Sequence, residues 1–121
     1  MPRILVADDD ALIRKYIEIT LSASGHEVSV AVDGLDAREQ LETETFDLLI
    51  TDLMMPRLSG EELIAGAVED HPDLAILVVS AKASYDPPAR EEGLPGIGFL
   101  QKPVRATALK KKIDSLIALQ E

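Results

Sequence analysis

The chain has 121 residues, a formal net charge of −10, no cysteine and only 3% aromatic residues. This length suits one domain, residues 1–121, with an aliphatic core. The lack of cysteine excludes disulfides, thiolate metal sites and cysteine nucleophiles, and we expect a cytoplasmic protein. The acidic balance argues against direct binding to nucleic acid, and the apolar runs are too short for membrane insertion.

Strand and helix patterns alternate along the chain. Apolar residues recur at helical spacing, as at Ile13, Ile17 and Leu21, or form short continuous runs typical of buried strands. In chain order the predicted elements are a strand at 4–6, a helix from 11 to 25, a strand at 27–31, a helix from 33 to about 44, a strand at 48–50, a helix from 59 or 60 to 71, strands at 76–79 and 98–100, and a helix from about Arg105 to Leu119.

The segment between the last two strands breaks this regularity. The alternation calls for a helix there, but prolines open and close the stretch. Only residues 87–92, about two turns, are predicted to be helical, and they have little apolar surface. We expect this helix to be short or mobile.

Five strand–helix units with near-continuous apolar strands predict an α/β fold. Such units build a parallel sheet with helices on both faces. The handedness of the crossovers limits the topology to a few doubly wound orders.

Polar residues stand where four of the five strands end. The first strand ends in Asp8 and Asp9, the third in Asp52, the fourth in Ser80 and the fifth near Lys102. In a parallel sheet these ends meet at one edge, where ligands bind in open α/β folds. The sequence therefore predicts a shared site at this edge.

The chemistry of these groups suits phosphoryl transfer to an aspartate. Clustered carboxylates repel one another unless a cation is present, and oxygen ligands of this kind suit Mg²⁺. A lysine and a serine hydroxyl are suited to phosphoryl oxygens.

Each residue also has a plainer interpretation. Asp52 taken alone is a turn residue, and Asp10 is better read as the N-cap of the first helix than as a ligand. Ser80 and Lys102 are ordinary for a strand end and a surface. The coincidence of suitable groups at four strand ends favours the site.

These residues resemble the receiver domain of two-component response regulators, over essentially the whole chain. The matching motifs are ILVADDD at 4–10, DLLITDLMMP at 47–56 with SG at 59–60, VVSA at 78–81 and GFLQKP at 98–103. The resemblance implies a flavodoxin-like, doubly wound (βα)5 fold whose five-stranded parallel sheet has the strand order 2-1-3-4-5.

By this resemblance Asp52 is the phosphoacceptor. Asp8, Asp9 and Asp52 would hold Mg²⁺, or Mn²⁺ in its place, together with the backbone carbonyl of Met54.

The resemblance also implies roles for other positions of the motifs. Ser80 would hydrogen-bond the phosphoryl group, Lys102 would pair with it, and the Lys102–Pro103 peptide would be cis. Phe99 matches the switch aromatic. It lacks the hydroxyl of the commoner tyrosine, so its switching would depend on packing alone.

The implied function is a phosphorylation-controlled switch, not an enzyme with a separate substrate. It would take its phosphoryl group from a histidine kinase or a histidine phosphotransfer protein, and it would catalyse only its own phosphorylation and dephosphorylation. The signal would pass, through the face formed by the fourth helix, fifth strand and fifth helix, to a downstream protein that the sequence does not identify. We expect no output domain within these residues.

Two other functions stay open. In a haloacid-dehalogenase-like phosphatase, Asp8 and Asp10 would be nucleophile and acid. A pseudo-receiver would bind partners without being phosphorylated.

Two side chains are expected to affect the lifetime of the phosphoryl group. By the resemblance, Met54 and Lys82 flank the path of the attacking water. Neither positions a water, and Lys82 can hold the phosphoryl charge, so we expect slow hydrolysis.

Overall fold

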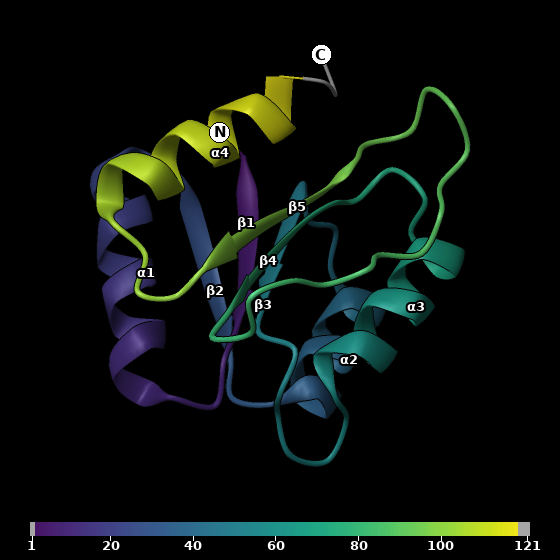
Figure 1. The fold of residues 1–121 in the computed structure, drawn as a ribbon, viewed down its shortest axis with the longest axis horizontal. Helices are drawn as coiled ribbons and strands as arrows, with labels where there is room; N and C mark the ends of the chain where they lie inside the picture. The colour runs from purple at the N-terminus through teal and green to yellow at the C-terminus, as the bar shows by residue number, and fades with distance from the viewer. Residues whose placement is uncertain (1, 119–121) are drawn as a thin grey trace.

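The computed structural model describes residues 2–118, which form five strands and four helices (Figure 1). In chain order they are β1 (Arg3–Ala7), α1 (Ala11–Ala23), β2 (Glu27–Ala31), α2 (Gly34–Thr43), β3 (Leu48–Thr51), α3 (Gly60–Asp70), β4 (Ala75–Ser80), β5 (Ile97–Gln101) and α4 (Ala106–Ala118). The predicted end of the last helix, Leu119, lies outside the described residues. None of these helices has the length and apolar character needed to cross a membrane.

The strands form one parallel sheet in the order β2-β1-β3-β4-β5, as the resemblance implies. This order confirms the doubly wound, flavodoxin-like fold. β3 is the central strand, and β2, the strand whose sequence alternates, lies at an edge. Because every pair is parallel, all strands end at the same edge of the sheet.

Two helices cover each face of the sheet (Figure 1). On one face α1 and α4 pack through Ile17, Leu21, Leu109 and Ile113, and on the other α2 and α3 pack through aliphatic residues such as Leu41 and Ile64. The strands supply both cores, because successive side chains point to opposite faces. Truncating one such buried aliphatic side chain to alanine typically costs about 2–5 kcal/mol.

Side-chain caps define where the helices begin. Asp10 accepts hydrogen bonds from the N–H groups of Leu12 and Ile13, and Asp33 and Ser59 cap α2 and α3 in the same way. The predicted starts at these residues are therefore confirmed, and so is the plainer interpretation of Asp10. α1 stops at the predicted place, because Gly25 adopts a φ of 89° beyond its last turn.

The predicted helix at residues 87–92 was wrong: no helix forms between Ser80 and Ile97. The described chain therefore has four helices, not the five of a complete (βα)5 unit. Prolines 87 and 88 donate no backbone hydrogen bonds, and Gly93, with a φ of 93°, closes a turn in which the Leu94 N–H donates to the Glu91 carbonyl.

A side chain, in place of a helix, fixes this irregular segment to the rest of the molecule. The Arg90 guanidinium donates to the carbonyl oxygens of Leu74 and Pro72, each at 2.7 Å. Tyr85 packs against the core beneath α2 and α3. The segment 81–96 therefore covers part of the sheet face without regular backbone hydrogen bonding.

Candidate functional site

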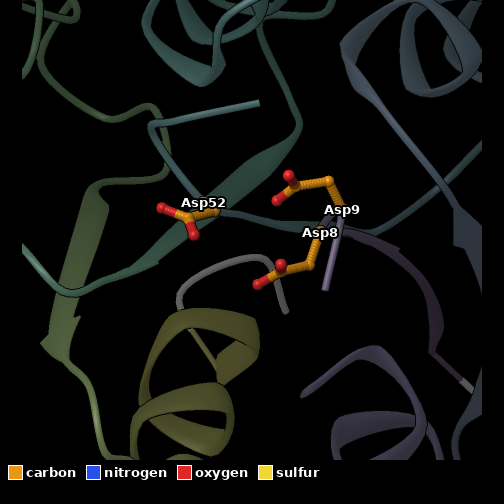
Figure 2. Close-up of side chains that lie close together, drawn as sticks. All are labelled: Asp8, Asp9 and Asp52. Atoms are coloured by element: carbon orange, nitrogen blue, oxygen red, sulfur yellow. The ribbon is translucent and has the colours of Figure 1, made fainter. Parts of the chain in front are cut away.

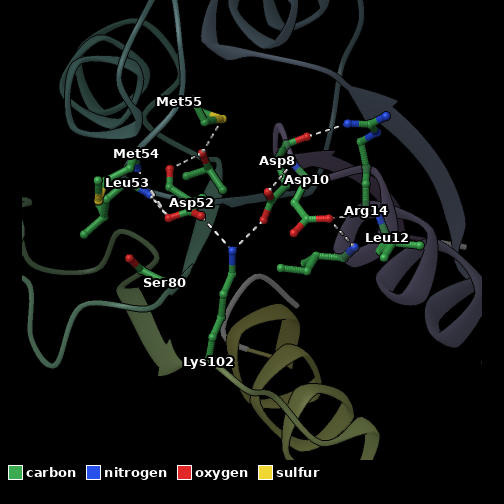
Figure 3. A network of polar contacts seen from close by, with 12 residues as sticks. Asp8, Asp10, Leu12, Arg14, Asp52, Leu53, Met54, Met55, Ser80 and Lys102 are labelled. Carbon is green, nitrogen blue, oxygen red and sulfur yellow. Dashed lines mark hydrogen bonds and ion pairs between the residues drawn. The ribbon is translucent and has the colours of Figure 1, made fainter.

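The parallel strands bring the predicted site residues to one edge of the sheet (Figure 3). Asp8 and Asp9 follow β1, Asp52 follows β3, Ser80 ends β4, and Lys102 follows β5. Because β1, β3, β4 and β5 are neighbours in that order, residues far apart in sequence meet here.

Three carboxyl groups gather at this edge. One carboxylate oxygen from each of Asp8, Asp9 and Asp52 lies within 4.8 Å of the others. Figure 2 shows the carboxyl groups of Asp8 and Asp9 pointing to the side of Asp52. Asp8 is only 2% exposed and Asp52 only 9%, whereas Asp9 faces solvent. A cation that enters from solvent therefore meets Asp9 first.

Lys102 joins two of these carboxylates. Its Nζ lies 2.7 Å from Oδ2 of Asp52 and 2.9 Å from Oδ2 of Asp8 (Figure 3). Burial by itself lowers the pKa of Lys102, but the hydrogen bonds to Asp52 and Asp8 outweigh this effect and raise it. The ammonium is therefore a fixed positive charge at the site. The peptide bond from Lys102 to Pro103 is cis.

The backbone after β3 orients the Asp52 carboxylate. Oδ1 accepts hydrogen bonds from the N–H groups of Leu53, at 2.6 Å, and Met54, at 3.3 Å. With Oδ2 on Lys102, both carboxylate oxygens accept hydrogen bonds, which fix the orientation of the group that would act as the nucleophile.

Burial makes the charged form of the Asp8 carboxylate unfavourable, although the residue accepts several hydrogen bonds. Its Oδ1 accepts the Asp10 N–H at 2.9 Å, and Arg14 Nη1 donates to its backbone oxygen at 2.7 Å. Burial nevertheless raises the pKa of Asp8, because the hydrogen bonds from Asp10 and Lys102 offset only part of the desolvation. A bound cation would relieve this cost.

The donor set fits a hard divalent cation. Each of the three aspartates offers a carboxylate oxygen, and Mg²⁺ binds through one or two carboxylates while it keeps several waters. The exposure of Asp9 leaves space for such waters. Asp8, Asp9 and Asp52 are the residues that would hold Mg²⁺.

The remaining predicted residues lie around this centre. Ser80 is buried, and its Oγ accepts the N–H of Lys82 at 3.3 Å. Phe99 pairs with Val78 across β4 and β5 and packs, half-buried, against the core under α2 and α3. Met54 is 64% exposed at the rim. Lys82 makes an ion pair with Glu61.

Asp10 does not take part in the cluster. Its carboxylate faces the first turn of α1, where Oδ1 accepts from Leu12 at 2.9 Å (Figure 3). A phosphatase that uses Asp8 and Asp10 as nucleophile and acid needs that side chain at the reacting centre. Because Asp10 is occupied as the N-cap of α1, the structure argues against the haloacid-dehalogenase-like alternative.

Sequence reasoning missed how three residues, Gly60, Arg14 and Glu61, support the site or lie beside it. A Cβ on Gly60 would come within 1.8 Å of the Asp52 carbonyl oxygen, so only glycine lets α3 begin this close to the site. The sequence marks Gly60 as a helix start but carries no sign of this contact. Arg14 and Glu61 look like ordinary charges on helix surfaces, and nothing in the sequence distinguishes them.

Comparison with known proteins gives a consistent result. Residues 4–114 match the family model described as the response regulator receiver domain. The chain is 32% identical to the response regulator receiver protein CpdR of Brucella abortus (strain 2308), over 97% of this chain and 98% of CpdR. It is 34% identical to response regulator MprA of Mycobacterium ulcerans (strain Agy99), over 95% of this chain and 50% of MprA. The chain thus spans about half the length of MprA.

Solved structures share the fold. A CheY-like receiver domain protein of Methanospirillum hungatei JF-1 superposes with a TM-score of 0.86 at 26% identity, covering 99% of this chain and 96% of that one. The response regulator TrrA of Thermotoga maritima, solved in complex with Mg²⁺-BeF, gives 0.83 at 27% identity, covering 96% and 99%. The receiver domain of the hybrid histidine kinase CckA gives 0.80 at 28% identity, covering 95% and 98%.

Proposed function

The chain belongs to the response regulator receiver domain family, a family of signalling domains, and on that premise we propose that it takes a phosphoryl group onto Asp52 from a phosphohistidine. The donor would be a histidine kinase or a histidine phosphotransfer protein. The observation that supports this most is the 2.7 Å contact between Asp52 Oδ2 and Lys102 Nζ, beside the carboxylates of Asp8 and Asp9.

The proposed reaction is an in-line displacement at phosphorus. An oxygen of the Asp52 carboxylate forms the new P–O bond while the P–N bond to the donor histidine breaks, and its electron pair stays on the imidazole. The Lys102 ammonium pairs with a phosphoryl oxygen as the Asp52 oxygen becomes part of an acyl phosphate. Mg²⁺ held by Asp8, Asp9, Asp52 and the Met54 carbonyl would supply further positive charge to the phosphoryl oxygens.

Phosphorylation would act as a switch through Ser80 and Phe99. The Ser80 hydroxyl can donate to a phosphoryl oxygen, since its present bond uses it as an acceptor. Val78 and Ser80 point to the same face of β4, and Val78 pairs with Phe99. A shift of Ser80 toward Asp52 therefore changes the space beside the Phe99 ring. The proposed output face consists of segment 81–96, β5 and α4.

Apolar side chains beside the site favour a protein as the donor. Leu12 is 82% exposed at the start of α1, and Tyr16 follows one turn later. A groove of about 460 Å³ runs between these residues and the chain at Lys102 to Val104. An apolar helix face of a phosphodonor protein would bury this surface and bring its phosphohistidine to Asp52.

The test is phosphotransfer from radiolabelled histidine kinases and phosphotransfer domains of the source organism. Wild type should become labelled only with Mg²⁺, and Asp52→Asn should not. Leu12→Glu should slow transfer from a protein donor while labelling by acetyl phosphate is unchanged. Equal labelling of Asp52→Asn and wild type would overturn the proposal, and so would failure of every donor and of acetyl phosphate to label wild type, the outcome expected of a pseudo-receiver.

A further inference from the structure

An ion pair that the reaction above does not use lies beside the site. Lys82 Nζ is 3.4 Å from Glu61 Oε1. Glu61 lies in the first turn of α3, and Lys82 lies just after the end of β4.

The backbone that carries Glu61 is held close to Asp52. The preceding residue, Gly60, donates its N–H to the Leu53 carbonyl at 2.9 Å, and it packs directly against the Asp52 backbone. The helix start is further fixed by Ser59, whose Oγ accepts the Glu62 N–H at 3.1 Å. The backbone of Glu61 therefore keeps its position relative to Asp52.

The backbone of Lys82 is hydrogen-bonded to Ser80, the residue whose hydroxyl would face the phosphoryl group. Its backbone N–H donates to Ser80 Oγ, and Ser80 is fully buried at the end of β4. Its side chain is 47% exposed, which leaves the ammonium free to exchange partners.

We infer that Glu61 is a positioning residue: its carboxylate competes with the phosphoryl group on Asp52 for the Lys82 ammonium. The inference rests on the proposed function. Before phosphorylation Lys82 pairs with Glu61, and afterwards a second and more highly charged acceptor stands nearby. Glu61 reduces the time that Lys82 spends on the phosphoryl oxygens.

This competition sets the lifetime of the signal. A lysine on the phosphoryl oxygens shields them from water without acting as a base, so each departure of Lys82 toward Glu61 exposes the acyl phosphate. Both members of the pair are about half exposed, so the effect is modest and weakens as salt rises.

The experiment is a double-mutant cycle on phosphoryl decay. Protein labelled with acetyl phosphate is freed of donor and followed with excess Mg²⁺ for wild type, Glu61→Gln, Lys82→Met and the double variant. Glu62→Gln is the matched control, because it removes the adjacent charge and keeps a side-chain oxygen that can accept from Ser59 Oγ, as Glu62 does. Glu61→Gln should lengthen the half-life about two- to fivefold. Glu62→Gln should leave it within about 1.5-fold of wild type. When Lys82 is already replaced by methionine, Glu61→Gln should leave the half-life unchanged. Added salt should reduce the difference in half-life between the single variant Glu61→Gln and wild type.

Two results would overturn the inference. One is an unchanged or shorter half-life in Glu61→Gln. The other is a lengthening that persists with Lys82→Met, which would show that the Glu61 charge acts directly on the phosphoryl group. Failure of the proposed function looks different, because wild-type Asp52 would then carry no phosphoryl group whose decay could be compared.

Discussion

Three carboxylates and one ammonium group determine the behaviour of the site at the scale of single residues. Lys102 forms ion pairs with Oδ2 of both Asp8 and Asp52 and so neutralises part of their charge. The other carboxylate oxygen of Asp52, Oδ1, accepts a backbone N–H. Asp8 is the member that burial disfavours most clearly, since its pKa is raised despite its hydrogen bonds. The ionised form of Asp8 therefore costs the metal-free protein some folding free energy.

The first prediction follows from that cost. Asp8→Asn should stabilise the metal-free protein at neutral pH by about 1 kcal/mol. A carboxyl group whose pKa is raised on folding binds its proton more tightly in the native state, so stability falls as pH rises from 3.8 through the raised value. The advantage of Asp8→Asn should therefore grow over the same pH range.

Urea unfolding of both proteins in EDTA, at several pH values, measures this difference. Glu39→Gln, which removes an exposed charge on α2 away from the cluster, controls for the general loss of acidity. A variant Asp8→Asn that is less stable than wild type at pH 7 would contradict the account.

The second prediction concerns signal lifetime. Met54→Asn and Lys82→Glu should each speed dephosphorylation, because asparagine can position a water and glutamate cannot hold the phosphoryl charge. Met54 is 64% exposed at the rim, which gives a water access once the thioether is replaced. Decay is followed after donor removal with excess Mg²⁺. A change below about twofold in both variants, worth about 0.4 kcal/mol of barrier, would mean that neither side chain acts on the path.

Much of the candidate site could be predicted because parallel strands end at a common edge. Once Asp8, Asp52, Ser80 and Lys102 are assigned to strand ends, their convergence follows from the topology alone. The pairing of Lys82 with Glu61 could not be predicted, because it depends on how close α3 begins to Asp52. That distance comes from the lack of a side chain at Gly60, which a single sequence does not reveal.

Among the structural elements, segment 81–96 breaks the alternation of strands and helices, because no helix connects β4 to β5. Its sequence shows that a long helix is impossible, since prolines interrupt it. It does not show the alternative, because Arg90 bonds to carbonyl groups 16 and 18 residues earlier in the chain. Contacts of that kind depend on tertiary structure, whereas the caps at Asp10, Asp33 and Ser59 are local and could be predicted.

The third prediction tests this segment directly. Amide hydrogens of residues 85–96 should exchange much faster than those in α4, because most of them lack a regular backbone partner. Hydrogen exchange read by mass spectrometry compares the two segments within one sample. Exchange in 85–96 as slow as in α4 would mean that the segment forms protected structure in solution.

Acidity matters at the scale of the whole molecule. The net charge of −10 is spread over the chain, while three adjacent lysines, at 110–112, lie on α4. The acidic cluster at the sheet edge adds local repulsion to this general excess. Binding of a divalent cation there should therefore stabilise the entire domain.

The fourth prediction is that Mg²⁺ raises the midpoint of thermal unfolding. A cation at ten times its dissociation constant stabilises the fold by about 1.4 kcal/mol, which is a shift of several degrees. Asp9→Ala should abolish most of this shift, because Asp9 is the exposed carboxylate of the cluster. Asp10→Asn is the matched control, since asparagine keeps the cap of α1 and removes a neighbouring charge.

Calorimetry at millimolar Mg²⁺ measures both effects. We expect a clear upward shift of the unfolding midpoint in wild type and in Asp10→Asn. The absence of a shift in wild type, or an undiminished shift in Asp9→Ala, would count against the metal site.

Chemical localisation of the phosphoryl group tests whether Asp52 is the phosphoacceptor. Protein treated with acetyl phosphate and Mg²⁺ is reduced with borohydride, which converts an aspartyl phosphate to homoserine, and its peptides are sequenced by mass spectrometry. Homoserine is expected at position 52, dependent on Mg²⁺ and missing from Asp52→Asn. Homoserine at Asp8 or Asp10 with Asp52 unmodified would contradict this expectation.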